Sequence, residues 1–171
     1  MKRAPSLLKL AFVSHKWVGV VAALVLAVIA STGILLLAKK YVPWIQPTER
    51  TGAAPNSPTI SFDDILAACR TDPRLEISTW ADVNRLDVRP ARGIVKVRAR
   101  NDWEAQIDLA SGELLQVAYR RSDLIESIHD GSFFADWAHT VLWPAAALSL
   151  LFLILSGLFL WLKPKLRRSR R

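Results

Sequence analysis

The chain has 171 residues, of which 51% are hydrophobic and seven are tryptophan, and its formal net charge is +8. This combination is typical of a membrane protein rather than of a soluble basic domain. A nucleic-acid-binding patch is disfavoured because the basic residues flank apolar stretches. The single cysteine, Cys69, excludes an internal disulfide and a thiol pair for a metal.

Two uncharged stretches, residues 18–38 and 140–162, are each long enough to cross a hydrocarbon layer of about 30 Å as a helix. Outside residues 41–136 there are twelve basic residues and no acidic residue. Because cationic segments resist export, both termini are predicted to be cytoplasmic and the middle of the chain periplasmic, in a bacterial inner membrane. Lys39 and Lys40 count against this orientation, but the two tails carry more positive charge.

The first stretch, within residues 1–40, is expected to stay attached as an anchor. Its apolar run is longer than the roughly 7 to 15 residues of a signal-peptide core. Residues 41–60, which include the sequence TGAAPNSP, are predicted to be an exported linker. Gly19 in the first span and Gly157 in the second are expected to let the two helices approach closely.

A small domain is predicted over residues 61–121. It begins with a short helix over SFDDILAACR, in which Ser61 is the N-cap and Asp64 completes an acidic variant of the capping box. Cys69, near the end of this helix, is expected to be a small buried apolar group. A domain of about 60 residues buries little core, so packing against the membrane helices or a second copy is also expected.

Five segments of the domain alternate apolar and polar residues as strands do: LEISTW, NRLDVR, IVKVRAR, WEAQIDL and ELLQVAY. They predict an antiparallel sheet of three to five strands with the helix packed against it. In WEAQIDL the apolar residues share one face, and Glu104, Gln106 and Asp108 share the other. The carboxylates alternate with arginines, which favours a solvated sheet face over a catalytic site.

A juxtamembrane helix is predicted over residues 122–136, with a break near Gly131, and the second span with its basic tail over residues 137–171. The predicted fold class is therefore an α+β membrane protein. Two transmembrane helices flank a small periplasmic domain, in which one helix packs on an antiparallel sheet. Motifs for phosphate loops, HExxH metal sites and nucleophile elbows do not occur.

IDLASGELLQV, at residues 107–117, resembles the sheet signature of PepSY domains, whose characteristic positions are here Asp108, Ser111, Gly112 and Glu113. SHKWVGVV, IHDGSFFADW and LSGLFLWLKP are similar to the entry, middle and exit motifs of the PepSY-associated transmembrane family. The segments occur in the expected order, so the resemblance covers most of the chain. Longer members have more spans, so this short two-span form is expected to form a homodimer or to recruit a membrane partner.

The resemblance implies a role in iron acquisition, because some larger members are inner-membrane ferric-siderophore reductases that carry haem. It implies b-type haem as the cofactor and electron transfer across the bilayer as the activity. If the chain is an enzyme, it would be a membrane oxidoreductase of the ferric reductase type. The alternative is a non-enzymatic module, anchored in the membrane, that binds or regulates a periplasmic protein partner.

The chain's three histidines, His15, His129 and His139, are the candidate axial ligands of this haem. At a helical rise of about 1.5 Å per residue, His15 lies near the inner face of the membrane and His139 near the outer face. His129 shares the outer level. The apolar walls there would be Phe133, Phe134, Trp137 and Trp143.

Two other interpretations of these histidines stay open. The first is that the histidines are polar anchors, which lie among the lipid headgroups and bind no ligand. Alternatively, a non-haem metal would find mixed nitrogen and oxygen ligands in His129, Asp130, Asp136 and His139. The chain has no Cys-x-x-Cys-His motif for covalent haem attachment.

Overall fold

The computed structural model describes residues 6–168 of the chain. They form two compact units, which we call the helical unit (residues 6–34 and 125–168) and the sheet unit (residues 35–124). Four of the basic residues that support the predicted orientation lie outside the described residues: Lys2, Arg3, Arg170 and Arg171.

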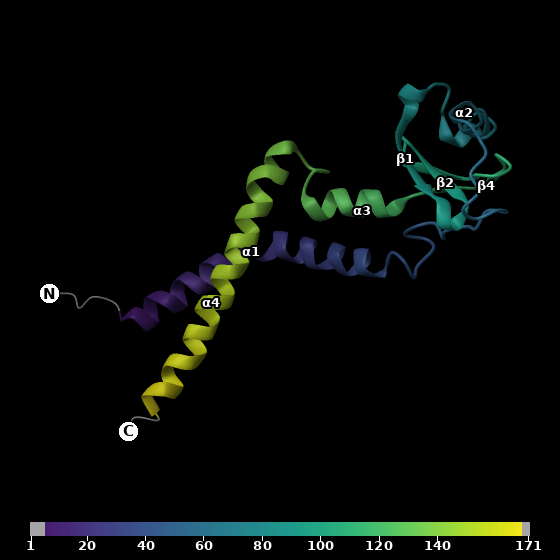
Figure 1. Cartoon of the computed structure of the whole chain (residues 1–171). Helices are drawn as coiled ribbons and strands as arrows, with labels where there is room; N and C mark the ends of the chain where they lie inside the picture. The colour runs from purple at the N-terminus through teal and green to yellow at the C-terminus, as the bar shows by residue number, and fades with distance from the viewer. Residues whose placement is uncertain (1–5, 169–171) are drawn as a thin grey trace. The chain divides into compact units, whose positions relative to one another are not determined.

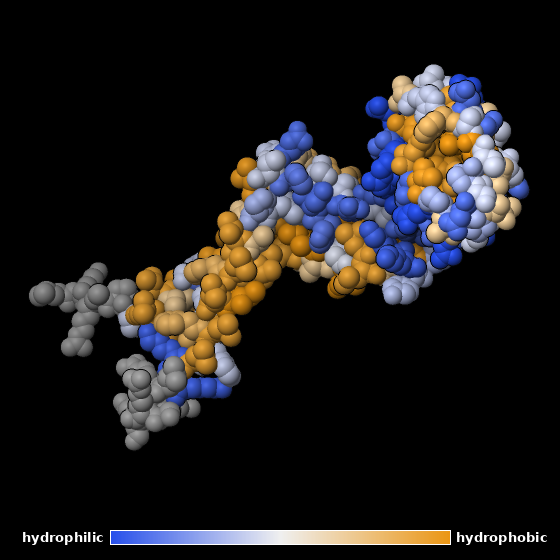
Figure 2. Space-filling model, viewed as in Figure 1, coloured by the Kyte–Doolittle hydropathy of each residue, from blue (hydrophilic) through white to orange (hydrophobic). Residues whose placement is uncertain are grey.

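The helical unit is built on two long helices, α1 (Leu7–Ala38) and α4 (Trp143–Arg168), which cross each other (Figure 1). Residues Leu7–Ala38 and Ala138–Lys163 are long and apolar enough to cross a membrane, which agrees with the two predicted spans. Most of their side chains face outward, and the surface over these helices is mainly hydrophobic (Figure 2). A Cβ added to Gly19 would lie 3.6 Å from Leu153 Cδ2, which is an ordinary contact distance between the two helices.

A sharp turn joins α3 (Arg121–Asp130) to the second span. Gly131 has a φ of 85°, which glycine adopts without strain, so the predicted break in the helix is confirmed. The span then opens with a π-helical turn, η4 (Ala138–Leu142). Pro144 follows this turn and has no N–H to donate to the preceding helical turn, which explains the local widening of the helix.

The sheet unit contains a four-stranded antiparallel sheet in the order β1-β2-β3-β4. Short turns connect the strands, and η3 (Pro90–Arg92) lies between the first two. The helix α2 (Phe62–Cys69) packs on one face of the sheet. Ser61 and Asp64 cap it reciprocally, as predicted. The strands are β1 (Val83–Arg89), β2 (Ile94–Ala99), β3 (Trp103–Asp108) and β4 (Leu114–Tyr119).

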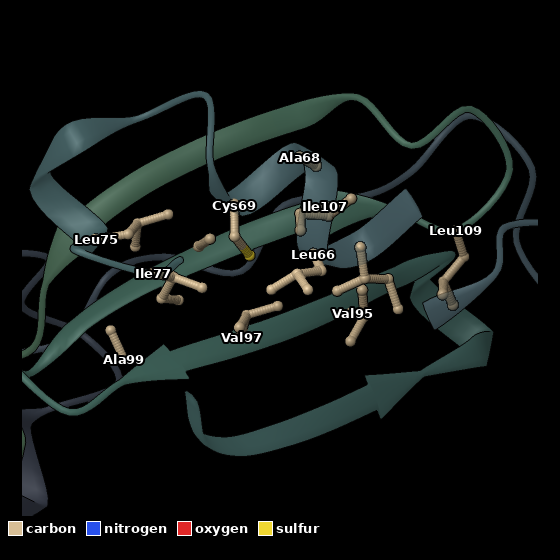
Figure 3. Packing of buried hydrophobic residues seen from close by; sticks show 12 residues of the cluster. Leu66, Ala68, Cys69, Leu75, Ile77, Val95, Val97, Ala99, Ile107 and Leu109 are labelled. Carbon is tan, nitrogen blue, oxygen red and sulfur yellow. The ribbon is translucent and has the colours of Figure 1, made fainter. Parts of the chain in front are cut away.

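The hydrophobic core lies between α2 and the sheet (Figure 3). Leu66 and Cys69 point down from the helix onto Val95, Val97 and Ile107 of the central strands. Each fully buried aliphatic side chain contributes about 1.5–3 kcal/mol to folding. Cys69 is completely buried, as predicted, and burial raises the pKa of its thiol to about 11.

The strand predicted over LEISTW is wrong. Leu75 ends a 3-10 turn, η1 (Pro73–Leu75), and a second 3-10 turn, η2 (Trp80–Asp82), begins at Trp80. Between them Glu76 has a φ of 54°, a left-handed conformation that does not pair in a sheet. Leu75 and Ile77 are nevertheless both buried, so this loop alternates like a strand without being one.

The prediction of a solvated sheet face is wrong for Glu104 and Asp108, whereas Asp87 on β1, with a side chain that is 36% exposed, agrees with it. Glu104, Gln106 and Asp108 are each at most 2% exposed. A polar side chain can be buried at acceptable cost only if its hydrogen-bonding atoms find partners. Glu104 pairs with Arg120 at 2.5 Å. Partners of Gln106 and Asp108 come from residues 48–53, which belong to the predicted linker and lie against this face.

Gln106 and Asp108 hold this segment through its backbone. The Gln106 side chain donates to Thr48 O at 3.1 Å and accepts from Arg50 N at 2.7 Å. Asp108 Oδ2 accepts from Ala53 N at 2.5 Å. The sheet therefore carries an apolar layer on one face and a buried polar layer on the other.

Candidate functional site

His15, on α1, hydrogen-bonds to the facing helix α4. Its Nδ1 lies 2.8 Å from Ser156 Oγ. The Ser156 hydroxyl also lies 2.7 Å from Phe152 O, and when it donates its proton there, Nδ1 of His15 is the donor to Ser156. A Cβ on Gly157 would lie 3.4 Å from His15 Cε1, so the glycine leaves just enough room for the ring.

His129, on α3, is held in the same way by α1. Its Nδ1 lies 3.0 Å from Thr32 Oγ1 and 3.1 Å from Ile29 O. Thr32 donates its hydroxyl proton to Val28 O at 2.7 Å, and a carbonyl oxygen can only accept. Nδ1 of His129 therefore carries a proton. A Cβ on Gly33 would lie 3.3 Å from His129 Cε1.

His139, in η4, also donates from Nδ1. Its partner is Asp130 O at 2.8 Å, again an acceptor that has no proton of its own. In all three histidines the hydrogen bond is thus made by Nδ1, and a neutral ring that donates from Nδ1 has its lone pair on Nε2. Within residues 6–168, none of these Nε2 atoms makes a hydrogen bond.

The histidines occupy two levels of the helical unit. Thr32 follows His15 by 17 residues on α1, so their levels are about 26 Å apart along the helix axis. His129 contacts Thr32, and His139 contacts the residue next to His129, so these two share a level. The structure thus brings His129 and His139 together and places His15 at the other end.

Two aromatic side chains, Trp143 and Phe134, lie beside His129. The Trp143 indole donates to His129 O at 2.7 Å and lies against Gly131, where a Cβ would come within 2.6 Å of it. Phe134 packs on Trp143 with their ring centroids 5.4 Å apart. Trp137, one of the four aromatic residues predicted to form apolar walls, has a side chain that is 63% exposed.

The described residues contain no group of three or more His, Cys, Asp or Glu side chains arranged to hold a metal ion. His129, Asp130, Asp136 and His139 therefore do not assemble as a non-haem metal site in these residues. The remaining donors are the three Nε2 lone pairs, which are nitrogen ligands suited to iron.

Ser156 and Thr32 were not anticipated from the sequence as functional residues. Both are at most 9% exposed, and each hydrogen-bonds to Nδ1 of one histidine from a facing helix. A signal was present in the sequence: a hydroxyl residue directly precedes a glycine once in each span, at Thr32-Gly33 and at Ser156-Gly157. In each case the glycine leaves room for the imidazole ring, and the hydroxyl forms a hydrogen bond with Nδ1 of that ring.

A family model described as PepSY-associated TM region matches residues 12–171. The match includes both apolar helices, the sheet and all three histidines. No curated protein and no solved structure matches the chain.

Proposed function

Because the chain belongs to the PepSY-associated TM region family, it is a membrane-anchored PepSY protein, and we propose that it binds b-type haem. In this proposal it lies in a bacterial inner membrane, with both termini cytoplasmic and the sheet unit periplasmic. It carries electrons across the membrane in support of ferric-siderophore reduction. The observation that carries the proposal is shared by the three histidines: each hydrogen-bonds through Nδ1 to an oxygen, and within residues 6–168 no Nε2 is engaged.

This donor set fits haem iron. A histidine that ligates a metal usually does so through one ring nitrogen while the other donates to an oxygen that orients the ring and raises its basicity. Ser156 Oγ, Thr32 Oγ1 and Asp130 O are the orienting oxygens here. A histidine that serves only as a headgroup anchor would not need a fixed tautomer.

The residues have distinct tasks in the proposed activity. When bound, the haem supplies a one-electron redox centre. Ser156 and Thr32 hold His15 and His129 in place, and the adjacent glycines admit the rings. Trp143 fixes the end of α3 and so the position of His129.

The two-level arrangement supports a transmembrane direction of electron flow, with one site near each face. His15 is the only histidine of the chain at its level. Two axial ligands at that level therefore require two copies of the chain. The largely exposed apolar surfaces of α1 and α4 would be covered in such a dimer, which has the helix number of a four-helix bundle.

A visible spectrum of the detergent-solubilised full chain tests the proposal. We expect a Soret band, and we expect His15→Gln to remove one spectral component and His139→Gln another. Ser149→Ala is the control, because Ser149 bonds only to Ala145 O of its own helix and should keep the full haem content. A folded protein that takes up no haem when haem is added would contradict the proposal.

One observation favours the alternative, a non-enzymatic module that binds a periplasmic protein. Phe62 and Trp80 form an edge-to-face pair with their centroids 5.9 Å apart, and they are 66% and 38% exposed. Exposed aromatic side chains are common anchors in protein interfaces. A colourless but folded protein would favour this function over haem binding.

A further inference from the structure

A basic pocket lies in the sheet unit, between the chain that follows α1 and the strands β1 and β2. Its volume is about 390 Å³. The segment 46–48 forms one wall. The charged residues that line it are Lys39, Lys40, Glu49, Arg89 and Lys96.

One carboxylate in the pocket is shared by three cations. Glu49 lies 3.1 Å from Lys96 Nζ, 3.7 Å from Arg92 Nε and 3.9 Å from an Arg89 nitrogen. Lys96 is only 6% exposed, so its ammonium group is largely removed from water. Its carboxylate partner, Glu49, is shared with Arg89 and Arg92. Asp87 pairs with Arg89 at 2.8 Å and supplies the second negative charge nearby.

Lys39 and Lys40 add charge that nothing in the pocket balances. Neither ammonium group makes an ion pair with any carboxylate of residues 6–168. On formal charges, the five basic residues of the pocket and its rim exceed the two acidic ones by three. An anion that enters the pocket would meet ammonium and guanidinium donors together, which favours a phosphate group.

The position of the two lysines identifies the source of the phosphate. They directly follow Ala38, the last residue of an apolar helix of 32 residues, which at about 1.5 Å per residue is longer than the hydrocarbon layer. Tyr41 and Trp44 follow and are 85% and 62% exposed, as aromatic residues of the headgroup region are. The pocket therefore lies beside a chain segment at headgroup level.

We propose that this pocket binds the phosphate of an anionic phospholipid. Lys39 and Lys40 contact the headgroup, and Arg89 and Lys96 receive its phosphate deeper in the pocket. The bound lipid also joins the chain after α1 to the sheet, because it contacts both. The site is independent of the histidines, so its presence or absence leaves the proposed haem binding untouched.

Hydrogen exchange of the full chain in lipid nanodiscs tests this site. We expect that replacing part of the phosphatidylcholine with phosphatidylglycerol slows exchange in residues 39–49 and 89–96. In Lys40→Gln/Arg89→Gln, about tenfold more phosphatidylglycerol should be needed for the same protection. The matched control, Arg74→Gln/Arg85→Gln, removes two positive charges of the same unit outside the pocket and should behave like the wild type.

Equal exchange of the wild-type chain in both lipids would overturn the proposal, whatever the variants do. Inorganic phosphate added to the phosphatidylcholine nanodiscs separates the two sources of phosphate. If it protects the same segments while phosphatidylglycerol does not, the pocket binds a free anion, and the assignment to lipid is wrong. Protection by phosphatidylglycerol that survives in the pocket variant but not in the control would also overturn it.

Discussion

At the scale of single residues, the same small device occurs twice in the helical unit. A buried hydroxyl lies within hydrogen-bond distance of both a carbonyl of its own helix and the Nδ1 of a facing imidazole, and when it donates to the carbonyl, the imidazole donates from Nδ1. The adjacent glycine lets the ring come close enough. In that arrangement the tautomer of His15 and of His129 is set by a neighbour on another helix.

Nitrogen-15 NMR of the haem-free protein, labelled at histidine and kept above pH 8, checks this tautomer. We expect a protonated Nδ1 and an unprotonated Nε2 in all three rings. Ser156→Ala should give His15 a mixture of both tautomers and leave His129 unchanged, because Ser156 contacts only the first ring. Ser149→Ala should change neither, and a wild-type His15 protonated at Nε2 would refute the assignment.

Asp108 controls the acid stability of the sheet unit. The N–H of Ala53, together with the N–H groups of Ala110 and Ser111, holds the pKa of this buried carboxyl below its ordinary value, although burial alone would raise it. A lowered pKa means that the ionised group is favoured by folding. Its contribution is fully present above the unfolded-state pKa of about 3.9 and is lost as the pH falls through the lower folded value.

We expect Asp108→Asn to lower the free energy of unfolding by about 1–3 kcal/mol at pH 7, because an amide NH₂ would face backbone N–H donors. The difference from the wild type should shrink in acid. Denaturant unfolding between pH 3 and pH 7 measures both effects. Asp102→Asn is the control: Asp102 has a φ of 65°, which asparagine tolerates, so little change is expected.

At the scale of elements, the segment before α2 acts as part of the sheet domain although it has no regular structure. Its backbone donates from Gly52 to Arg92 O and from Asn56 to Pro90 O, both at 2.8 Å. These bonds fasten it to η3, beside the first two strands. The bonds of Gln106 to Thr48 and Arg50 and of Asp108 to Ala53 therefore exist only while this segment stays in place.

Gly52→Ala should detach this segment. The new Cβ would lie 2.1 Å from Gly93 O, a backbone atom that cannot rotate away. We expect a loss of about 1–3 kcal/mol in the free energy of unfolding and faster hydrogen exchange over residues 48–56. Ser57→Thr adds one methyl group at an exposed position of the same segment, and an equal effect there would contradict this explanation.

Alternation along the chain was enough to predict the four strands, because residues such as Val95 and Val97 meet the core at every second position. Alternation gave a wrong prediction where residues are buried for a reason other than their place in a strand. Leu75 and Ile77 alternate in a loop, and Gln106 is buried by a segment more than fifty residues away in the sequence. The histidines were found as rare polar residues beside apolar runs, but their hydroxyl partners depend on which helices meet.

At the scale of the whole molecule, the distribution of charge is the basis for the proposed orientation. Positive residues outside 41–136 favour cytoplasmic termini. An impermeant thiol reagent tests this, because the natural thiol of Cys69 is buried and its pKa is raised to about 11, so it reacts slowly.

We expect Ser57→Cys to be labelled in intact spheroplasts and Ser6→Cys only after the membrane is permeabilised. Both serines are exposed, so access to the reagent depends on the side of the membrane alone. The reverse pattern would place the sheet unit in the cytosol and remove the proposed route for electrons.

The two membrane helices have the same spacing between their contact residues, and this spacing limits which insertions and deletions the chain can tolerate. On α1 the ring of His15 and the hydroxyl of Thr32 are 17 positions apart, and the same number separates His139, in η4, from Ser156 on α4. Inserting or deleting one residue within either interval would turn one end by about 100° relative to the other. Substitutions of the outward-facing side chains of these helices should therefore be tolerated. The number of residues in each interval, by contrast, is constrained by the contacts at both ends.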